Sequence, residues 1–76
     1  MKYRKKPVII EAEQFVLNST WPKQVYRDSI CSTGFVVDTL EGCFAVSDGD
    51  WIITGVVGEV YPCRPWIFDM TYEKVE

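Results

Sequence analysis

Every glycine of this 76-residue chain lies between residues 34 and 58, and together the glycines divide that part of the sequence into short segments. The segments are rich in β-branched and aromatic side chains, as in Phe35-Val36-Val37 and Trp51-Ile52-Ile53. Apolar runs this short, bounded by turn residues, are typical of strands and too short for helices. We therefore predict antiparallel strands over 34–40, 43–46, 51–54 and 59–61, with turns at 41–42, 47–50 and 55–58.

The two ends of the chain carry different patterns. Residues 8–16 begin with a β-branched run and predict a first strand. Pro22 suits a first helical turn, so residues 21–30 predict a short helix. Pro62 cannot donate to a strand ladder, which places Tyr61 near a strand end or a sheet edge. Pro65 starts a helical turn that reaches Met70, and the alternating residues 71–75 predict a closing strand.

These elements predict a small α+β fold in a single domain, residues 1–76. The expected architecture is a curled antiparallel β-sheet, a meander that forms a partly open barrel, with one or two short helices. The chain is 47% hydrophobic and 14% aromatic, which is typical of a globular domain. A core this small is marginal on its own, so we expect self-association into a homo-oligomer.

Charge and hydropathy limit the classes of partner. Residues 1–37 hold six Lys or Arg against three acids, and residues 38–76 hold two against eight, giving nets of +3 and −6. The acidic half disfavours a nucleic-acid surface, because phosphate would be repelled. The only basic run is the cluster at residues 2–6. The apolar run before Glu11 is too short for a signal peptide, and no stretch is long enough to span a bilayer. We expect no membrane partner and a cytoplasmic location.

The three cysteines, Cys31, Cys43 and Cys63, suggest free thiols rather than a metal site. The chain has no CxxC pair and no histidine, so the usual zinc ligands are missing and a thiol nucleophile lacks its usual base. Cys63 is the best candidate for a reactive group, since the adjacent Arg64 would lower its pKa. A small buried apolar side chain is the favoured interpretation. We predict no catalytic residue, no metal site and no cofactor.

The triplet Asp48-Gly49-Asp50 resembles a fragment of a calcium loop, but the later glutamate of such a loop is missing. We interpret it as a turn. Gly55-Val56-Val57-Gly58 does not form a phosphate loop, because Glu59 follows it where a P-loop has Gly-Lys.

Five aromatic residues lie within 22 positions of the C-terminal half, and strand alternation buries about half of such a set. Tryptophan, tyrosine and arginine are the residues that dominate protein-interaction surfaces. The candidate binding surface for a partner or ligand is therefore Trp51, Tyr61, Arg64 and Trp66. We expect Trp66 to be the ring that stays exposed.

Three parts of the chain resemble a family of short proteins encoded by phages and prophages: KYRKKPVIIEA at residues 2–12, TLEG at 39–42, and DGDWIITGVVGEVYPCRPWIFDMTYE at 48–73. Asp48 stands where this family usually has proline, and Trp66 stands where an acidic residue is usual. The resemblance implies a viral or prophage accessory protein in the bacterial host cytoplasm. It supplies no catalytic motif.

Three hypotheses for the function remain open. The favoured one is a non-enzymatic phage or prophage accessory protein that modulates or inhibits a host protein, including a defence protein, by direct contact. The second is an oligomer that sequesters a small nucleotide signal in a pocket between chains, with Trp51, Tyr61, Arg64 and Trp66 supplying stacking and charge. The third is a virion or assembly component.

Overall fold

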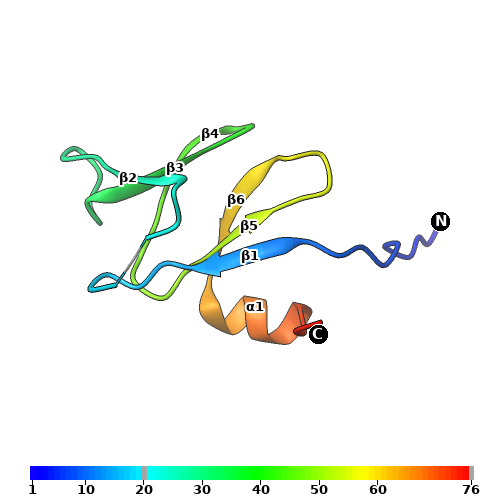
Figure 1. Ribbon diagram of the computed structural model, residues 1–76. Helices are drawn as coiled ribbons and strands as arrows, with labels where there is room; N and C mark the ends of the chain where they lie inside the picture. Colours follow the sequence, from blue (N-terminus) through cyan, green and yellow to red (C-terminus); the bar gives the residue numbers. More distant parts are fainter. Residues whose placement is uncertain (20, 76) are drawn as a thin grey trace.

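A computed structural model describes residues 1–19 and 21–75, and its strands are short and paired in antiparallel fashion (Figure 1). In chain order the elements are β1 (Glu11–Gln14), β2 (Val25–Arg27), β3 (Phe35–Thr39), β4 (Gly42–Ala45), β5 (Trp51–Thr54), β6 (Val60–Cys63) and α1 (Pro65–Thr71). The strands predicted at residues 34–40, 43–46, 51–54 and 59–61 are confirmed as β3 to β6, with bounds that differ by one or two residues except in β5, and the helical turn that Pro65 starts is confirmed as α1.

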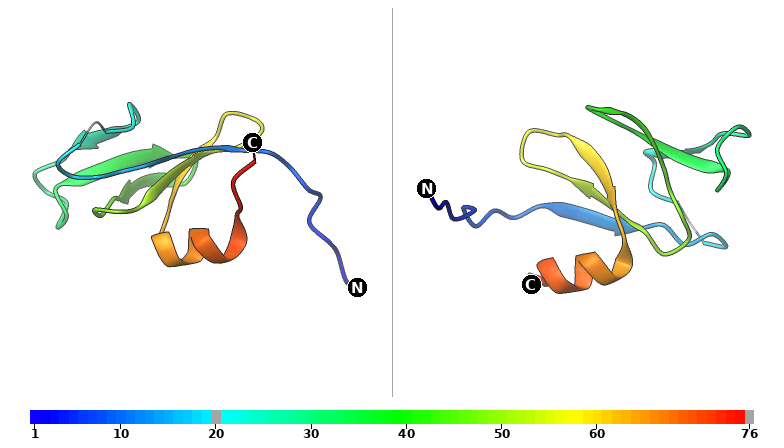
Figure 2. Two further views of the ribbon diagram at one scale, coloured as in Figure 1. Left: turned by 60° about the horizontal axis from the view of Figure 1, so that its bottom comes forward. Right: turned by 180° about the vertical axis from the view of Figure 1, so that it is seen from behind.

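The strands form two three-stranded sheets, in the orders β1-β5-β6 and β2-β3-β4. The prediction of one curled sheet was wrong in this respect, because the chain changes sheet between β4 and β5 and so does not make a continuous meander. The two sheets do not close into a barrel (Figures 1 and 2). The coarser class, a small antiparallel α+β fold with one short helix among the described residues, is confirmed.

The core lies where the two sheets face each other. Phe15, Val25, Val37, Val46 and Ile52 are buried there and contact one another. Three of these side chains come from β2, β3 and β5, so the cluster fixes the sheets against each other by removing apolar surface from water. An aromatic cluster of Phe15, Trp21 and Phe35 extends this core, with ring centroids 4.9 to 5.7 Å apart.

The turn before β5 ties the end of β1 to the start of the hairpin. The Phe15 N–H donates to the Asp50 carbonyl, and the Gly49 N–H donates to the Phe15 carbonyl, both at 2.7 Å. Gly49 has a φ of 93°, a conformation that side chains with a Cβ rarely adopt. The interpretation of Asp48-Gly49-Asp50 as a turn is confirmed.

The helix predicted over residues 21–30 was wrong, and this segment forms turns and β2. Val25 is 7% exposed and packs in the core, where it pairs with Val37 of β3. Pro22 is buried, and its carbonyl accepts a hydrogen bond from the Val25 N–H in a single turn. The β-branched and aromatic pair Val25-Tyr26 suits a strand, and tertiary pairing decides the outcome.

Two predicted strand boundaries also need correction. The first strand covers only residues 11–14 of the predicted 8–16, because its partner β5 ends at Thr54, opposite Glu11. The closing strand predicted over residues 71–75 is absent from this described segment. Tyr72 caps α1 instead, since its N–H donates to the Phe68 carbonyl at 2.9 Å.

Pro62 lies within β6, at the free edge of the first sheet. The Gly55 N–H donates to the Glu59 carbonyl at 2.8 Å. In an antiparallel ladder, every second residue of β6 after Glu59 then directs its backbone N–H and C=O groups towards β5. Tyr61 and Cys63 are those residues. The nitrogen of Pro62 therefore points away from the ladder, where its missing N–H breaks no bond. The prediction that Tyr61 lies at a sheet edge is confirmed.

Phe15→Ala should lower the free energy of unfolding by about 3–5 kcal/mol, because it removes a fully buried ring and leaves a cavity. Phe44→Ala is the matched control: its ring is 43% exposed, and the same change there should cost less than half as much. Urea denaturation followed by circular dichroism measures both. Equal losses would contradict the placement of the core.

Candidate functional site

The predicted surface residues lie around the junction of β5, β6 and α1, but only Tyr61 lines either of the two hollows found beside β6. Trp51 and Tyr61 belong to β5 and β6, Arg64 precedes α1, and Trp66 lies in its first turn. Trp51, Tyr61 and Arg64 make ring, hydroxyl and ion-pair contacts within the fold, whereas the Trp66 side chain is largely exposed.

Arg64 forms an ion pair with Asp50. Its Nη1 donates to both carboxylate oxygens of Asp50, at 3.1 Å to Oδ1 and 2.9 Å to Oδ2. Asp50 is 2% exposed and also accepts a hydrogen bond from the Ser47 N–H at 2.9 Å. The Arg64 side chain is half exposed. Its guanidinium therefore holds the start of α1 against the turn before β5. Sequence reasoning missed this partner of Arg64, because Asp50 was assigned to turn chemistry alone.

Trp51 is the base of an aromatic stack on α1. Its ring lies 4.3 Å from that of Phe68 with an interplanar angle of 9°, and Phe68 in turn stacks on Tyr72 at 5.0 Å. Phe68 and Tyr72 are four residues apart, which places them on one side of a helix. The stack therefore fixes which side of α1 faces the sheet.

Tyr61 joins this stack through its hydroxyl group. The Tyr61 and Tyr72 hydroxyls share a hydrogen bond of 3.3 Å. That bond, together with burial, raises the pKa of Tyr61 from 10.0 to about 12. Tyr61 thus connects β6 to the end of α1.

Trp66 and Met70 lie on the side of α1 that faces away from the stack. Trp66 is 64% exposed and Met70 is 77% exposed. The expectation that Trp66 stays exposed is confirmed, while its role in binding stays a prediction. Sequence reasoning did not include Met70, although its spacing of four residues from Trp66 predicts a shared helix side. We call Trp66 and Met70 the α1 patch.

The acidic residues of α1 and its end lie close to this patch in sequence. Asp69 and Glu73 are both exposed and four residues apart. α1 has no buried residue and no side-chain cap, and it begins with Pro65 after an extended Arg64. A helix of seven residues has little intrinsic stability in water. Its position therefore depends on the ion pair and the aromatic stack.

The expectation that Arg64 lowers the pKa of Cys63 was wrong. Burial and the nearby Asp50 carboxylate raise the pKa of the Cys63 thiol. The charge of Arg64 is directed at Asp50 instead. The cysteine whose pKa is lowered is Cys31, because the Thr33 side chain hydrogen-bonds to its sulfur. All three cysteines are free, and Cys63 is half-buried rather than fully buried as the favoured interpretation expects.

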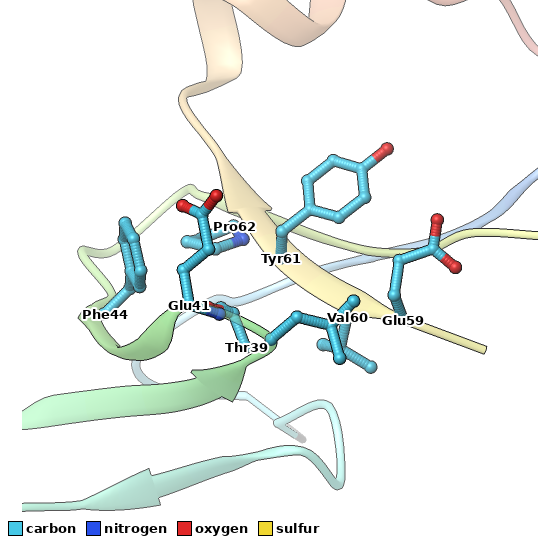
Figure 3. Close-up of a pocket in the computed structure, with 8 residues that line it drawn as sticks. Thr39, Glu41, Phe44, Glu59, Val60, Tyr61 and Pro62 are labelled. Atoms are coloured by element: carbon cyan, nitrogen blue, oxygen red, sulfur yellow. The ribbon is translucent and has the colours of Figure 1, made fainter. Parts of the chain in front are cut away.

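Two hollows lie beside β6, and Tyr61 lines both. A groove of about 320 Å³ runs between the β3–β4 turn and β6 (Figure 3). The Tyr61 ring is directed away from Glu41 and Phe44 there (Figure 3). A second hollow, of about 590 Å³, lies between residues 5–8, the outer face of β5 and β6, and α1. Trp51, Arg64 and Trp66 line neither hollow. Neither of these two hollows combines the four predicted residues, and a nucleotide pocket formed between chains stays a prediction.

Across residues 1–19 and 21–75, no group of three or more Cys, Asp or Glu side chains is placed to hold a metal ion. In the same residues, no helix has the length and apolar character needed to cross a bilayer. No family model, curated protein or solved structure matches this chain. The α1 patch and its support are therefore interpreted from their own chemistry.

Replacing Arg64 tests the support of α1. Arg64→Met keeps most of the apolar stem but leaves the buried Asp50 carboxylate without its cation, which should cost about 1–3 kcal/mol of unfolding free energy. The cost stays below that of a fully buried pair, because half of the Arg64 side chain faces water. Lys23→Met, at an exposed position, should change the stability by less than about 0.5 kcal/mol. A change at Arg64 no larger than this control would contradict the role of the ion pair.

The raised pKa of Tyr61 predicts a loss of stability at high pH. Its folded pKa of about 12 exceeds the ordinary value of 10.0, so the unfolded chain loses the proton first. The contribution of the protonated Tyr61 hydroxyl to the free energy of unfolding is complete below pH 10 and is lost as the pH rises towards 12. Tyr61→Phe should reduce this loss, measured by urea denaturation between pH 9 and 12, whereas Tyr3→Phe, at an 80% exposed position, should not. The pKa of Tyr26 is also raised, by its hydrogen bond to Asp38, so Tyr26 accounts for part of the loss of stability at high pH that remains in Tyr61→Phe.

Proposed function

We propose that this chain is a non-enzymatic accessory protein, of phage or prophage origin, that modulates a bacterial host protein by direct contact through the α1 patch. The phage origin rests on the resemblance of residues 2–12, 39–42 and 48–73. The contact surface rests on the structure of α1.

The observation that carries the proposal is the exposure of two large apolar side chains on a helix that is otherwise held in place. Trp66 and Met70 lie one helical turn apart and are 64% and 77% exposed. Tryptophan and methionine are enriched at protein interfaces, and tryptophan is a frequent hot-spot residue. On the other side, Phe68 and Tyr72 anchor α1 to Trp51. A fixed helix loses little conformational entropy when a partner binds.

The charges around the patch indicate the kind of partner. Asp69 and Glu73 are exposed on α1 and just after it, and residues 38–76 carry a net charge of −6. An interface with apolar residues at its centre and charged residues at its rim is typical of specific protein complexes. The partner we propose is a protein with an apolar pocket for the Trp66 ring and basic residues around it.

The side chains that could act as catalytic groups favour a binding role over catalysis. The chain contains no histidine. The pKa of Cys63, the candidate nucleophile, is raised, which disfavours the reactive thiolate. The Arg64 side chain pairs with Asp50 and lines neither of the two hollows beside β6.

The test is capture of the partner from a bacterial host lysate with the tagged full-length chain. We expect a partner recovered in stoichiometric amount. The double variant Trp66→Ala/Met70→Ala should weaken its binding at least about thirtyfold, since a hot-spot side chain contributes about 2 kcal/mol or more. Isothermal titration with the purified partner gives the dissociation constants.

A control truncates two exposed apolar side chains elsewhere on the molecule. Val56 and Val57, in the β5–β6 turn, are 68% and 81% exposed. Val56→Ala/Val57→Ala should leave the affinity within about twofold of the unmodified chain. A partner that binds the α1 double variant as tightly as the control would rule out the α1 patch as the contact surface.

A further inference from the structure

The first sheet has two edge strands, and they differ in whether another strand can add to them. β6 forms one edge, where Pro62 removes a backbone donor from the outward row. β1 forms the other edge and has no neighbouring strand beyond it among the described residues. Proteins protect exposed edges with proline, charge or bulges, because an open edge is a template for pairing with another chain. The β1 edge lacks proline protection in its outward row.

The hydrogen bonds at the end of β1 identify that outward row. The Phe15 N–H donates to the Asp50 carbonyl, so the odd-numbered residues of β1 face β5. The even-numbered residues, from Gln14 back through Ala12 and Ile10, direct their N–H and C=O groups outward. Continued along the chain, this alternation includes Val8 and Lys6. Pro7 falls in the other row and interrupts nothing at the open edge.

Residues 1–10 precede β1 as an arm: residues 5–8 line the second hollow beside α1, and the N-terminal end points away from the two sheets (Figures 1 and 2). The arm carries exposed apolar side chains: Ile9 is 75% exposed and Val8 is 49% exposed. β-branched residues favour the extended conformation. In an extended arm, the backbone groups would continue the alternation of inward and outward directions that β1 begins. A strand that runs from the arm into β1 would therefore extend the open edge well beyond Glu11.

We propose that a second copy of this chain occupies the open edge, through antiparallel pairing of the arm and β1 with the partner's arm and β1. A two-fold axis normal to the sheet relates the copies and passes through Ile9, which lies opposite the partner's Ile9. In this register Val8 pairs with the partner's Ile10, and Lys6 pairs with the partner's Ala12. These are the residues whose backbone groups face outward, so the ladder is complete across the axis.

Charge complementarity favours this register over one centred on Ile10. Lys5 lies opposite the partner's Glu13, and the symmetry repeats the pair on the other side of the axis. Opposite charges facing each other across a strand pair are stabilising, and like charges are destabilising. Centring the axis on Ile10 instead would place Lys5 opposite the partner's Phe15 and lose both ion pairs. Centring it on Ile9 also brings two exposed isoleucine side chains together.

The assembled sheet has six strands, in the order β6-β5-β1 of one copy followed by β1-β5-β6 of the other. A rotation about the sheet normal keeps each face on its own side. Gln14, opposite Trp51 in the register, shares the face that α1 covers. Both copies therefore present α1 on the same face of the continuous sheet.

The experiment is sedimentation velocity of the full chain over a concentration series, with charge reversal at the paired positions. The unmodified chain should sediment as a dimer. Lys5→Glu and Glu13→Lys should each raise the dimer dissociation constant about tenfold or more, because two like-charge pairs form per dimer. The double variant Lys5→Glu/Glu13→Lys restores opposite charges and should return the constant to within about threefold. Lys6→Glu, opposite the partner's uncharged Ala12, is the matched control and should keep the dimer.

A disulfide tests the register independently. With Cys31, Cys43 and Cys63 replaced by serine, Ile9→Cys should form a covalent dimer under mild oxidation, because the two positions face each other in a non-hydrogen-bonded pair. Ile10→Cys should not, since it lies opposite the partner's Val8. A monomeric chain, a dimer indifferent to both charge reversals, or faster cross-linking at position 10 would each overturn the proposal. Thermal unfolding of each variant shows whether the protomer is folded.

Discussion

The hydrogen bonds of Asp50 are the contacts on which the arrangement of the other elements depends. Its carbonyl accepts the Phe15 N–H, which extends the pairing of β1 with β5 into the turn. Its buried carboxylate accepts the Ser47 N–H and pairs with Arg64, which precedes α1. One residue thus joins the end of β1, the turn between the two sheets and the start of the helix. A buried carboxylate is costly unless it is paired and hydrogen-bonded, so the contacts with the Ser47 N–H and with Arg64 are both needed to keep the Asp50 side chain buried.

This constraint explains how a helix of seven residues can present a surface. Pro65 fixes the first backbone angle, Arg64 holds the start of α1 to Asp50, and Phe68 stacks on Trp51. The helix has no buried residue, so its stability comes from these contacts at one end and one side. Trp66 is left on the free side in a fixed position. The residues that orient α1 are therefore different from Trp66, the residue proposed for recognition. A substitution can change one of these roles without changing the other.

The local patterns that could be predicted from the sequence are those set by turns. Gly49 marks the turn before β5, and its positive φ is a requirement that glycine meets best. Residues 21–30 show where such prediction fails, because Pro22 fits a helix start as well as the buried turn observed. Val25 favours the strand over the helix, because its burial depends on pairing with β3, a strand that comes later in the chain. The ion pair of Arg64 with Asp50 was missed for the same reason, since no local pattern indicates which carboxylate an arginine reaches.

The proposed dimer and the proposed contact surface bear on each other through geometry. Because the two-fold axis is normal to the sheet, two copies of the α1 patch would lie on one face, some distance apart, with their acidic neighbours Asp69 and Glu73 beside them. A partner that is itself a symmetric oligomer could then engage both patches at once. The second contact becomes intramolecular, so the overall affinity rises without any new residue. A small surface such as Trp66 and Met70 would gain most from this arrangement, because each copy alone buries little area. The open edge of β1 would then bring a second copy of the patch to the interface, and with it binding strength that one patch does not supply alone.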